Sequence, residues 1–559
     1  MSLRDAERPN NAPGMARVGG GLGALAALFV VLGAAGSAGC ESLVCEIPGC
    51  GDREAKWDKN LEPADYPVAS VGLKGSVAVY DRPLDRMLML TSGSNLEVGM
   101  TSIPVGKNMA ALAPSVARDR LYVLSRGVQP RKNPSDELPS LTVIDGDGTP
   151  ERVARYELTD PLSGIAVDPL GEWVVVYDAG GVVVNPNELI LIKVDEPGRE
   201  PITKTIRSFG ARPQRLTFTS ELKLPNGPAR RLLVVETEQD VTLIDLLNPQ
   251  RDEVTVILPK TPSGVSSRPG QIAFHDGDPD DVNDARIAVR LVGESDVVIL
   301  DLGPTAEAGK DFKPTVNVAD VGGVPSSIDF VETDGGLRLA ALVPSKRAAS
   351  LVNPATTVVE SVNLPGGYSQ LARVTDSVAQ KPDFGDVALL WGGSQSDGIA
   401  FWSLGRTTGK PYRSVDAYEI GINVTAVQNV PGHEFGQRKI LVGEGASEFY
   451  VLDLDARTSF PMLTNQGGFE LSVSPDGGRA WALRRGTPEF AQINLSSLHP
   501  TSLEIERDVT AVYDIERRDG GRAVIALHSL GNLGVTVLDA LDPDSAETRF
   551  YPALLLGDL

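Results

Sequence analysis

The stretch HDGDPDDVND, residues 275–284, places Asp276, Asp278, Asp280 and Asp284 at relative positions 1, 3, 5 and 9. Alternate carboxylates in a tight loop converge on one point and supply the oxygen ligands that a hard cation such as calcium prefers. The stretch lies between the apolar runs QIAF and RIAV, which predicts a turn between two β-strands. Because acidic surface loops are common in acidic proteins, the sequence favours a solvated acidic loop here, with a structural calcium site at these four aspartates as the alternative.

The aspartate spacing resembles the calcium loops of integrin-type propeller repeats, which lie in the hairpin between the first and second strands of a repeat. Asp281 departs from that pattern, because such loops usually have glycine at its position. The resemblance implies calcium as a structural ion, and the sequence indicates no other cofactor.

All three cysteines of the chain, Cys40, Cys45 and Cys50, follow an apolar segment at residues 21–39. Their spacing, without a nearby histidine, matches neither the cysteine pairs of zinc sites nor the C-x-x-C-H motif that attaches haem. The apolar segment has the length of a signal peptide and ends in small residues. These features predict export of the chain.

The sequence Ser37-Ala38-Gly39-Cys40 resembles the cleavage box of bacterial lipoproteins, in which small residues precede the cysteine that receives lipid. Ser37 departs from the box, which usually has leucine there, so ordinary secretion and an uncleaved anchor remain open. If Cys40 carries lipid, Cys45 and Cys50 are left in an oxidising compartment that favours a disulfide between them. The intervening Pro48-Gly49 turn would bring their sulfurs together.

The predicted organisation is a signal peptide at 1–39, a lipidated N-terminus and tether at 40–74, and a repeat domain at 75–559. Met15 is a candidate for the true start, because residues 1–14 form an unusually long and partly acidic flank. Glu41 follows the lipid cysteine in place of the aspartate that retains many lipoproteins at the inner membrane. This favours the outer membrane.

The composition excludes some classes of function. The formal net charge of −22 repels phosphate backbones, so we expect no nucleic-acid partner. Apolar residues make up 42% of the 559 residues, which is enough for a core. The 58 glycines and 40 prolines indicate many turns, as in a chain of short β-strands.

One pattern recurs from about residue 75 to the end: four apolar strands separated by turns, at a spacing of about 32 to 56 residues. RLYVLS (120–125) followed by LTVIDGDG (141–148) shows the second and third strands of such a unit. Period-two alternation excludes a helical repeat. We predict an all-β propeller of four-stranded blades in about ten units, as one large ring or, alternatively, two tandem smaller propellers. The units are predicted to start near residues 76, 109, 163, 213, 269, 325, 369, 424, 469 and 509.

Three segments, SPDGGRAWAL (474–483), ARDRLYVLSRG (117–127) and DPLGEWVVVYD (168–178), resemble the hairpins of YVTN-type, lactonase-like β-propellers. Aspartate and glycine accept the tight turn between the innermost strand and the next strand. The resemblance covers nearly all of 75–559 and implies the fold. It is a poor guide to function.

Other candidate motifs are weak. DGDG at 145–148 lacks the later glycine and glutamate of an EF-hand. GRTTGK at 405–410 is one residue short of a phosphate-binding loop. There is no G-x-S-x-G sequence, and the histidines have no metal-binding spacing. The histidines are His275, His433, His499 and His528, and the aromatic residues that could pack blades or line a ligand surface are Trp173, Trp391, Phe401, Trp402 and Trp481.

These observations favour a non-enzymatic binding or scaffolding platform for a protein or polysaccharide partner in the cell envelope. We expect an outer-membrane lipoprotein, attached to the membrane through its lipid, whose body faces the periplasm or the cell surface. The irregular segments 126–140 and 259–270 are the predicted partner-contacting loops, with ordinary surface loops of no binding role as the equally weighted alternative. The resemblance leaves a lactonase-like, metal-dependent hydrolase as the alternative, and a quinone-dependent redox enzyme as a third option. No catalytic residue is assigned.

Overall fold

The computed structural model describes much of the chain between Ala69 and Pro552. The cysteines, the segment before residue 69 and the C-terminal 553–559 lie outside the described residues. The internal residues that are also left out are 181–184, 209–211, 225–227, 261–263, 265, 276–283, 304–313, 334, 375–386, 394–397, 405–413, 432–437, 445–446, 455, 464–468, 529–533 and 543–547.

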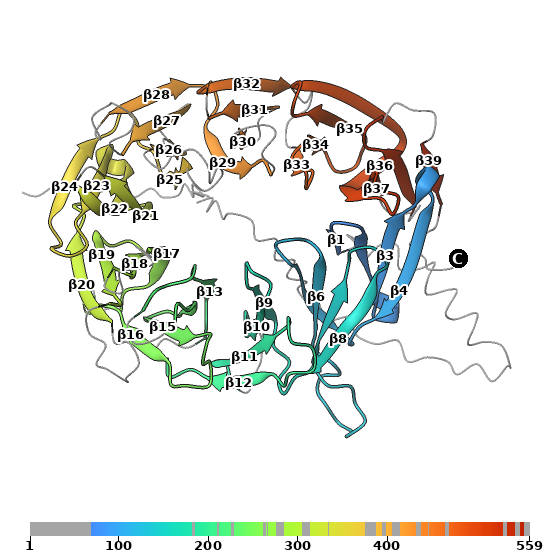
Figure 1. Cartoon of the computed structure of the whole chain (residues 1–559), viewed down its shortest axis with the longest axis horizontal. Coiled ribbons are helices and arrows are strands. Elements are labelled where there is room, and N and C mark those ends of the chain that lie inside the picture. The colour runs from blue at the N-terminus through green and yellow to red at the C-terminus, as the bar shows by residue number, and fades with distance from the viewer. Residues whose placement is uncertain are drawn as a thin grey trace, which may run out of the picture.

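The described chain forms eight four-stranded antiparallel sheets and one seven-stranded antiparallel sheet. We call each group of four successive strands a blade. The first strand of a blade lies toward the common centre and the fourth lies at the circumference (Figure 1). Blade 1 contains β1 (Ser70–Gly72), β2 (Val77–Asp81), β3 (Arg86–Ser92) and β4 (Val98–Pro104), and blade 2 contains β5 (Met109–Pro114), β6 (Arg120–Ser125), β7 (Ser140–Asp145) and β8 (Glu151–Glu157). Blade 3 contains β9 (Gly164–Val167), β10 (Trp173–Tyr177), β11 (Glu188–Lys193) and β12 (Ile202–Thr205), and blade 4 contains β13 (Arg215–Phe218), β14 (Leu232–Glu236), β15 (Asp240–Asp245) and β16 (Val254–Ile257). Blade 5 contains β17 (Pro269–His275), β18 (Arg286–Leu291), β19 (Asp296–Asp301) and β20 (Thr315–Asp320).

The second half of the chain continues the same order. Its last two blades share one strand, β36, whose pairing changes from β35 to β37 at Val509. Short 3-10 turns, η2 (Arg82–Leu84), η3 (Ser94–Leu96) and η4 (Pro344–Lys346), lie in blades 1 and 6. Blade 6 contains β21 (Ser327–Thr333), β22 (Gly336–Val343), β23 (Ala348–Val352) and β24 (Val359–Asn363), and blade 7 contains β25 (Gln370–Arg373), β26 (Val387–Trp391), β27 (Gly398–Ser403) and β28 (Val415–Glu419). Blade 8 contains β29 (Val424–Asn429), β30 (Arg438–Gly443), β31 (Glu448–Asp453) and β32 (Thr458–Leu463), and blade 9 contains β33 (Glu470–Val473), β34 (Arg479–Leu483), β35 (Thr487–Asn494) and β36 (His499–Glu516). Blade 10 contains the end of β36 with β37 (Arg522–His528), β38 (Val535–Asp539) and β39 (Arg549–Tyr551).

Ten apolar clusters, each shared by two blades, join the blades into one closed ring. Strand β10 shows how, because its side chains alternate between the two neighbouring blades. Trp173, Val175 and Tyr177 pack against blade 4, whereas Val174 and Val176 pack against blade 2. Both faces of each blade are therefore buried, and the prediction of a single ten-bladed propeller is confirmed.

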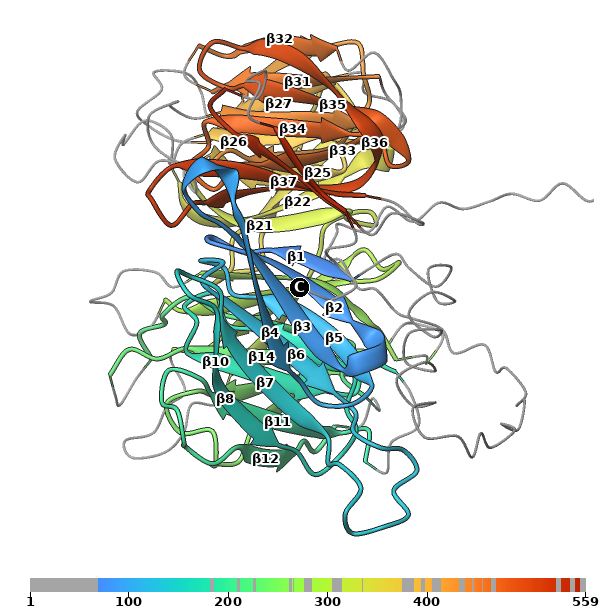
Figure 2. The ribbon, with the colours of Figure 1, turned by 90° about the vertical axis from the view of Figure 1, so that its right-hand side faces the viewer.

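The ring closes where blade 10 meets blade 1. One apolar cluster unites β2 and β3 with β36, β37 and β38. Figure 2, turned by 90°, shows the same neighbours, with β1 next to β36 and β37. Each sheet consists of strands that follow one another in sequence, so among the strands described from Ser70 to Tyr551 none pairs one end of the chain with the other.

The predicted repeat starts agree closely with the first strands of the blades. Nine of the ten units begin within a few residues of the predicted position, such as Met109, Val424 and Glu470. Blade 1 is the exception, because its innermost strand begins at Ser70 rather than near residue 76, inside the segment that the sequence assigned to the tether. A strand of three residues is too short to show alternation, so the sequence pattern first becomes visible at the second strand, β2.

The antiparallel order of each blade gives the ring two loop faces. Face 1 carries the connections between first and second strands and between third and fourth strands. Face 2 carries the connections between second and third strands and the connections from one blade to the next. The partner-contacting loops predicted at 126–140 and 259–270 both belong to face 2.

Candidate functional site

The hairpin between β33 and β34 on face 1 is held by its own polar side chains. The Ser474 hydroxyl accepts the Arg479 N–H at 2.9 Å and donates to Asp476 at 2.6 Å. Gly477 has φ +69°, and a Cβ there would lie 1.6 Å from the carbonyl oxygen of Pro431 in blade 8. The Ser-Pro-Asp-Gly sequence therefore both forms the turn and lets the turn approach the preceding blade.

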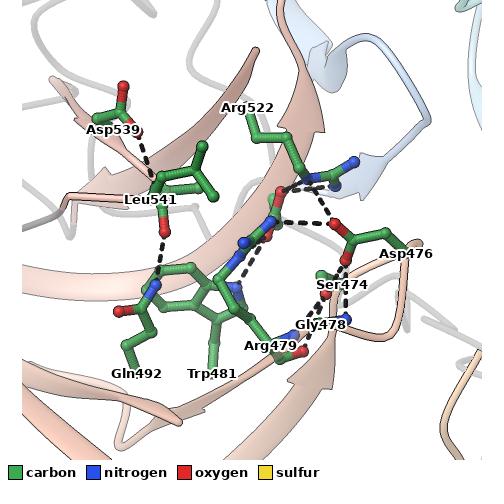
Figure 3. A network of polar contacts seen from close by, with 11 residues as sticks. Ser474, Asp476, Gly478, Arg479, Trp481, Gln492, Arg522, Asp539 and Leu541 are labelled. Carbon is green, nitrogen blue, oxygen red and sulfur yellow. Dashed lines mark hydrogen bonds and ion pairs between the residues drawn. The ribbon is translucent and has the colours of Figure 1, made fainter. Parts of the chain in front are cut away.

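A buried carboxylate organises the polar network between blades 9 and 10 (Figure 3). The Asp514 side chain is 2% exposed and accepts hydrogen bonds from Arg479 at 3.3 Å and from Trp481 at 3.3 Å. Its other oxygen accepts Arg522 Nε at 2.7 Å. Asp476 pairs with the same two arginines, at 3.2 Å to Arg479 and 3.7 Å to Arg522.

The ionised form of Asp476 is stabilised within this network. Burial opposes ionisation, whereas hydrogen bonds from Ser474 and Gly478 favour it. Together with the cations of Arg479 and Arg522, these bonds lower the pKa of the Asp476 carboxyl below its usual value. The network thus joins two arginines to two carboxylates across adjoining blades.

A related junction joins blades 3 and 4. Arg231, just before β14, pairs with the fully buried Asp168 and, at 2.6 Å, with Glu172. Asp168 also accepts the backbone N–H of Leu170 and of Glu172 at its own hairpin. These arginine–carboxylate contacts fix neighbouring blades, and their donors and acceptors are used by one another rather than by a reacting group.

Of the residues predicted for lipid attachment, the disulfide and calcium binding, the structure describes only Asp284. Cys40, Cys45 and Cys50 lie outside the described residues, as do Asp276, Asp278 and Asp280. Asp284 is described, and it lies just before β18, with its carbonyl accepting Arg286 Nη1 at 3.0 Å. Lipidation, the disulfide and the calcium site remain predictions.

Three of the four histidines are described, and they lie in blades 5, 9 and 10. His275 ends β17 with its ring 5.8 Å from that of Phe330, and His499 is exposed at the start of β36. His528 is buried, with Nε2 2.6 Å from the Thr536 hydroxyl. His433 lies outside the described residues. The described part of the chain contains no group of three or more His, Cys, Asp and Glu side chains placed to hold a metal.

His528 predicts a pH dependence of stability. Burial lowers the pKa of its imidazole, the Arg507 cation acts in the same direction, and the Asp508 carbonyl only partly opposes them. Because the folded-state pKa lies below the unfolded-state pKa, the unfolded chain binds more protons, and stability is lost as the pH falls below about 6.5.

We expect the melting temperature to drop between about pH 7.5 and about pH 5.5, and His528→Gln to reduce that drop. Thermal unfolding at both pH values checks this, with exposed His499→Gln as the control. An unchanged pH slope in His528→Gln would contradict it.

The aromatic side chains considered for ligand binding are packing residues. Trp402 and Trp481 are 0% and 1% exposed, and Trp173, Trp391 and Phe401 are buried as well. Each lies in a cluster between two blades. Of the two alternatives for these residues, the structure supports blade packing.

The predicted loop at 126–140 is an exposed loop with an ordered base. Val128 N–H donates to the Glu137 carbonyl at 3.0 Å, and Asp136 accepts the backbone N–H groups of Asn133 and Lys132 at 2.8 and 2.7 Å. These two hydrogen bonds lower the pKa of Asp136. The tip at 129–135 is exposed to solvent. The loop therefore presents a defined surface on face 2.

The remaining motifs are turns or lie outside the description. DGDG at 145–148 connects β7 to β8, with Asp145 accepting the Asp147 N–H at 2.9 Å and Lys74 pairing with Asp147 at 3.0 Å. Residues 405–410 are outside the described part. Among the described residues there is no helix long and apolar enough to span a membrane.

Sequence reasoning missed the charged residues that join the blades, such as Asp514, Arg522 and Arg231. Asp514 did carry a signal. It lies two positions after Val512 in the run VTAVYDIE, so the alternation places a carboxylate where an apolar side chain is expected.

Comparison with known proteins gives only distant structural similarities. The chain matches no protein-family profile and no curated protein. It is similar to a eukaryotic initiation factor, with 10% identity over 86% of this chain and 96% of that one and a TM-score of 0.45. It is also similar to the dihydro-heme d1 dehydrogenase NirN, with 16% identity over 76% of this chain and 78% of that one and a TM-score of 0.35. A third similarity is to the Pan2 WD40 domain of Neurospora crassa, with 12% identity over 57% of this chain and 85% of that one and a TM-score of 0.32. The strand order and the closed set of interblade clusters define the chain as a β-propeller repeat protein.

Proposed function

We propose that this protein is an exported, lipid-anchored propeller of the YVTN-type that acts as a binding platform in the bacterial cell envelope. Its partner is an envelope protein or polysaccharide that contacts face 2. The observation that carries the proposal is the exposed 126–140 loop, whose base is fixed by backbone hydrogen bonds and by the ion pair between Arg155 and Glu137. A loop that is already ordered loses little entropy when it binds a partner.

The remainder of the ring supports a scaffolding role. Both faces of each blade are used for packing, and the charged groups between blades 9 and 10 satisfy one another. Such a ring holds loops from many blades at fixed positions, which suits recognition of a large partner. Fold similarity alone does not choose between a platform and the lactonase-like alternative, so the test is designed to separate them.

The experiment is cross-linking affinity purification of the tagged full-length protein from its native membrane, with mass spectrometry of the captured material. The double variant Arg131→Glu, Lys132→Glu reverses two exposed charges at the tip of the 126–140 loop. We expect it to recover about fivefold less partner than the wild type, because interface energy concentrates in few residues. Arg118→Glu, exposed on face 1, is the matched control and is expected to recover the wild-type amount. Equal recovery with the loop variant, or no partner at all, would contradict the platform; ester or lactone hydrolysis would support the alternative.

Lipid attachment at Cys40 has its own test. We expect cells that express the full-length protein to incorporate labelled palmitate into it, and Cys40→Ser to abolish both the label and sedimentation with membranes, because the lipid attached to that cysteine is the proposed membrane anchor. Cys45→Ser is the control and is expected to keep the label. Membrane sedimentation of unlabelled Cys40→Ser protein would indicate the uncleaved apolar segment as the anchor instead.

A further inference from the structure

A β-bulge recurs at the inner edge of four blades near face 2. In each, the first strand has one extra residue before its pairing with the second strand resumes. In blades 8 and 10 the extra residue is a threonine, whose hydroxyl donates to a carbonyl of the second strand at 3.1 and 3.0 Å. The four extra residues are Ala110, Gly270, Thr425 and Thr510.

Blade 5 differs from the other three at the residue that pairs just after the bulge. Leu124, Val442 and Leu527 occupy this position in blades 2, 8 and 10, and each packs against an apolar cluster shared with the next blade. In blade 5 the position is Arg290, which pairs with Gln271. A position that otherwise carries an apolar side chain into the interblade core thus carries a guanidinium.

Gly270 makes the space that this guanidinium occupies. A Cβ at Gly270 would lie 2.8 Å from Nη2 of Arg290 and 3.0 Å from its Cζ. Nη1 donates to the Pro325 carbonyl in the connection to blade 6, at 3.3 Å. Nε is buried and has no hydrogen-bond acceptor among the described residues. Nε belongs to the Nε–Nη2 edge, the edge suited to bidentate oxyanion binding, so in the described part of the chain this edge has a donor without an acceptor.

The surrounding charges leave Arg290 without an ion pair in the described part of the chain. The nearby Glu236 carboxylate is already held by Arg215 in two hydrogen bonds of 2.6 Å. Burial lowers the pKa of Arg290, the Arg215 cation lowers it further, and Glu236 partly opposes them. Two cations and one anion therefore lie close together, in a protein whose overall charge is −22.

We propose that Arg290, in the slot opened by Gly270, binds an oxyanion that a partner presents to face 2, with Arg215 adding a second positive charge. The oxyanion is a carboxylate or a phosphate group, both of which match the guanidinium fork. This inference rests on the proposed binding role and specifies its chemistry. The site lies on the same face as the 126–140 loop.

The test measures anion binding by the purified protein and needs no partner. Citrate and inorganic phosphate are titrated separately at constant ionic strength, with sodium chloride as the reference. The readouts are the melting temperature and the Nε–H NMR signals of arginine-labelled protein, in which the Arg290 signal is the one missing from Arg290→Gln. We expect saturable binding of at least one anion and a shift of the Arg290 signal, since Nε gains an acceptor.

Three variants distinguish anion binding at a specific site from nonspecific attraction to positive charge. Arg290→Gln is expected to weaken anion binding about tenfold, because it removes the charge and the fork together. Gly270→Ala keeps the charge but fills the slot, and Arg290→Lys keeps the charge without the fork, so both are expected to weaken binding as well. Arg549→Gln, exposed on β39, is the matched control and is expected to bind like the wild type.

The outcomes are distinct. Equal binding by Arg290→Gln, or an anion effect no greater than that of chloride, would overturn the inference. If Arg290→Gln does not fold, Gly270→Ala and Arg290→Lys decide in its place. Citrate binding alone assigns a carboxylate, and phosphate binding alone assigns a phosphate. Anion binding without any captured partner would refute the platform while leaving the oxyanion site intact.

Discussion

Replacing Asp514 with alanine is expected to lower the free energy of unfolding by about 3–5 kcal/mol. The carboxylate is 2% exposed and is the shared acceptor for Arg479, Arg522 and the indole N–H of Trp481. Its removal leaves two cations in a partly buried interface where, in the part of the chain that the structure describes, only Asp476 remains to pair with them, and the Asp476 side chain is 43% exposed. Urea unfolding followed by tryptophan fluorescence measures the change.

Two further variants test the explanation. Asp519→Ala removes an exposed carboxylate that pairs with Arg517 in the neighbouring hairpin, and it is expected to leave the unfolding midpoint almost unchanged. Replacing Arg479, Asp514 and Arg522 together with Met, Leu and Met is expected to recover much of the lost stability, since apolar residues of similar volume avoid the desolvation cost. A loss below about 1 kcal/mol in Asp514→Ala would show that the network contributes little.

The sequence predicted the fold well because a propeller is a local pattern repeated. Each blade is made of four successive strands, so a strand and its partners lie within tens of residues of one another. The run RLYVLS and the hairpin at 474–478 were enough to locate β6 and the β33–β34 turn. The start of blade 1 was placed too late because β1 has only three residues and no visible alternation.

The contacts between blades were not predictable in the same way. Arg231 and Asp168 are 63 residues apart, and nothing in either local sequence names the other as its partner. Their pairing depends on how far one blade is rotated relative to the next, which is a property of the whole ring. Arg290 carried a partial signal, because RIAVRLV places an arginine in the phase of the buried Ala288. Only the comparison of bulges among blades shows that leucine or valine is the usual residue there.

The seam between blades 1 and 10 is held mainly by side-chain packing, so it is where we expect the ring to open first. A shared strand would add a ladder of backbone hydrogen bonds, but here the two blades remain separate sheets. The backbone bonds across the seam are few, such as Glu516 N–H to the Lys74 carbonyl at 2.7 Å and Arg518 N–H to the Ser92 carbonyl at 3.1 Å. The apolar cluster around Ile525 must therefore provide most of the stabilisation.

Ile525→Ala is expected to reduce stability by about 2–5 kcal/mol, because a fully buried side chain leaves a cavity that its neighbours fill only in part. Hydrogen exchange followed by mass spectrometry is expected to show faster exchange in β1–β4 and β37–β39 than elsewhere. Ile287→Ala is the matched control, because Ile287 is equally buried but lies between blades 4 and 5. Its destabilisation is expected to be similar in size without selective exchange at the seam. Uniform exchange around the ring in Ile525→Ala would mean that the seam opens no more readily than the other nine junctions. Side-chain packing between blades 1 and 10 would then hold them together as firmly as packing and the continuous chain hold the other neighbouring blades.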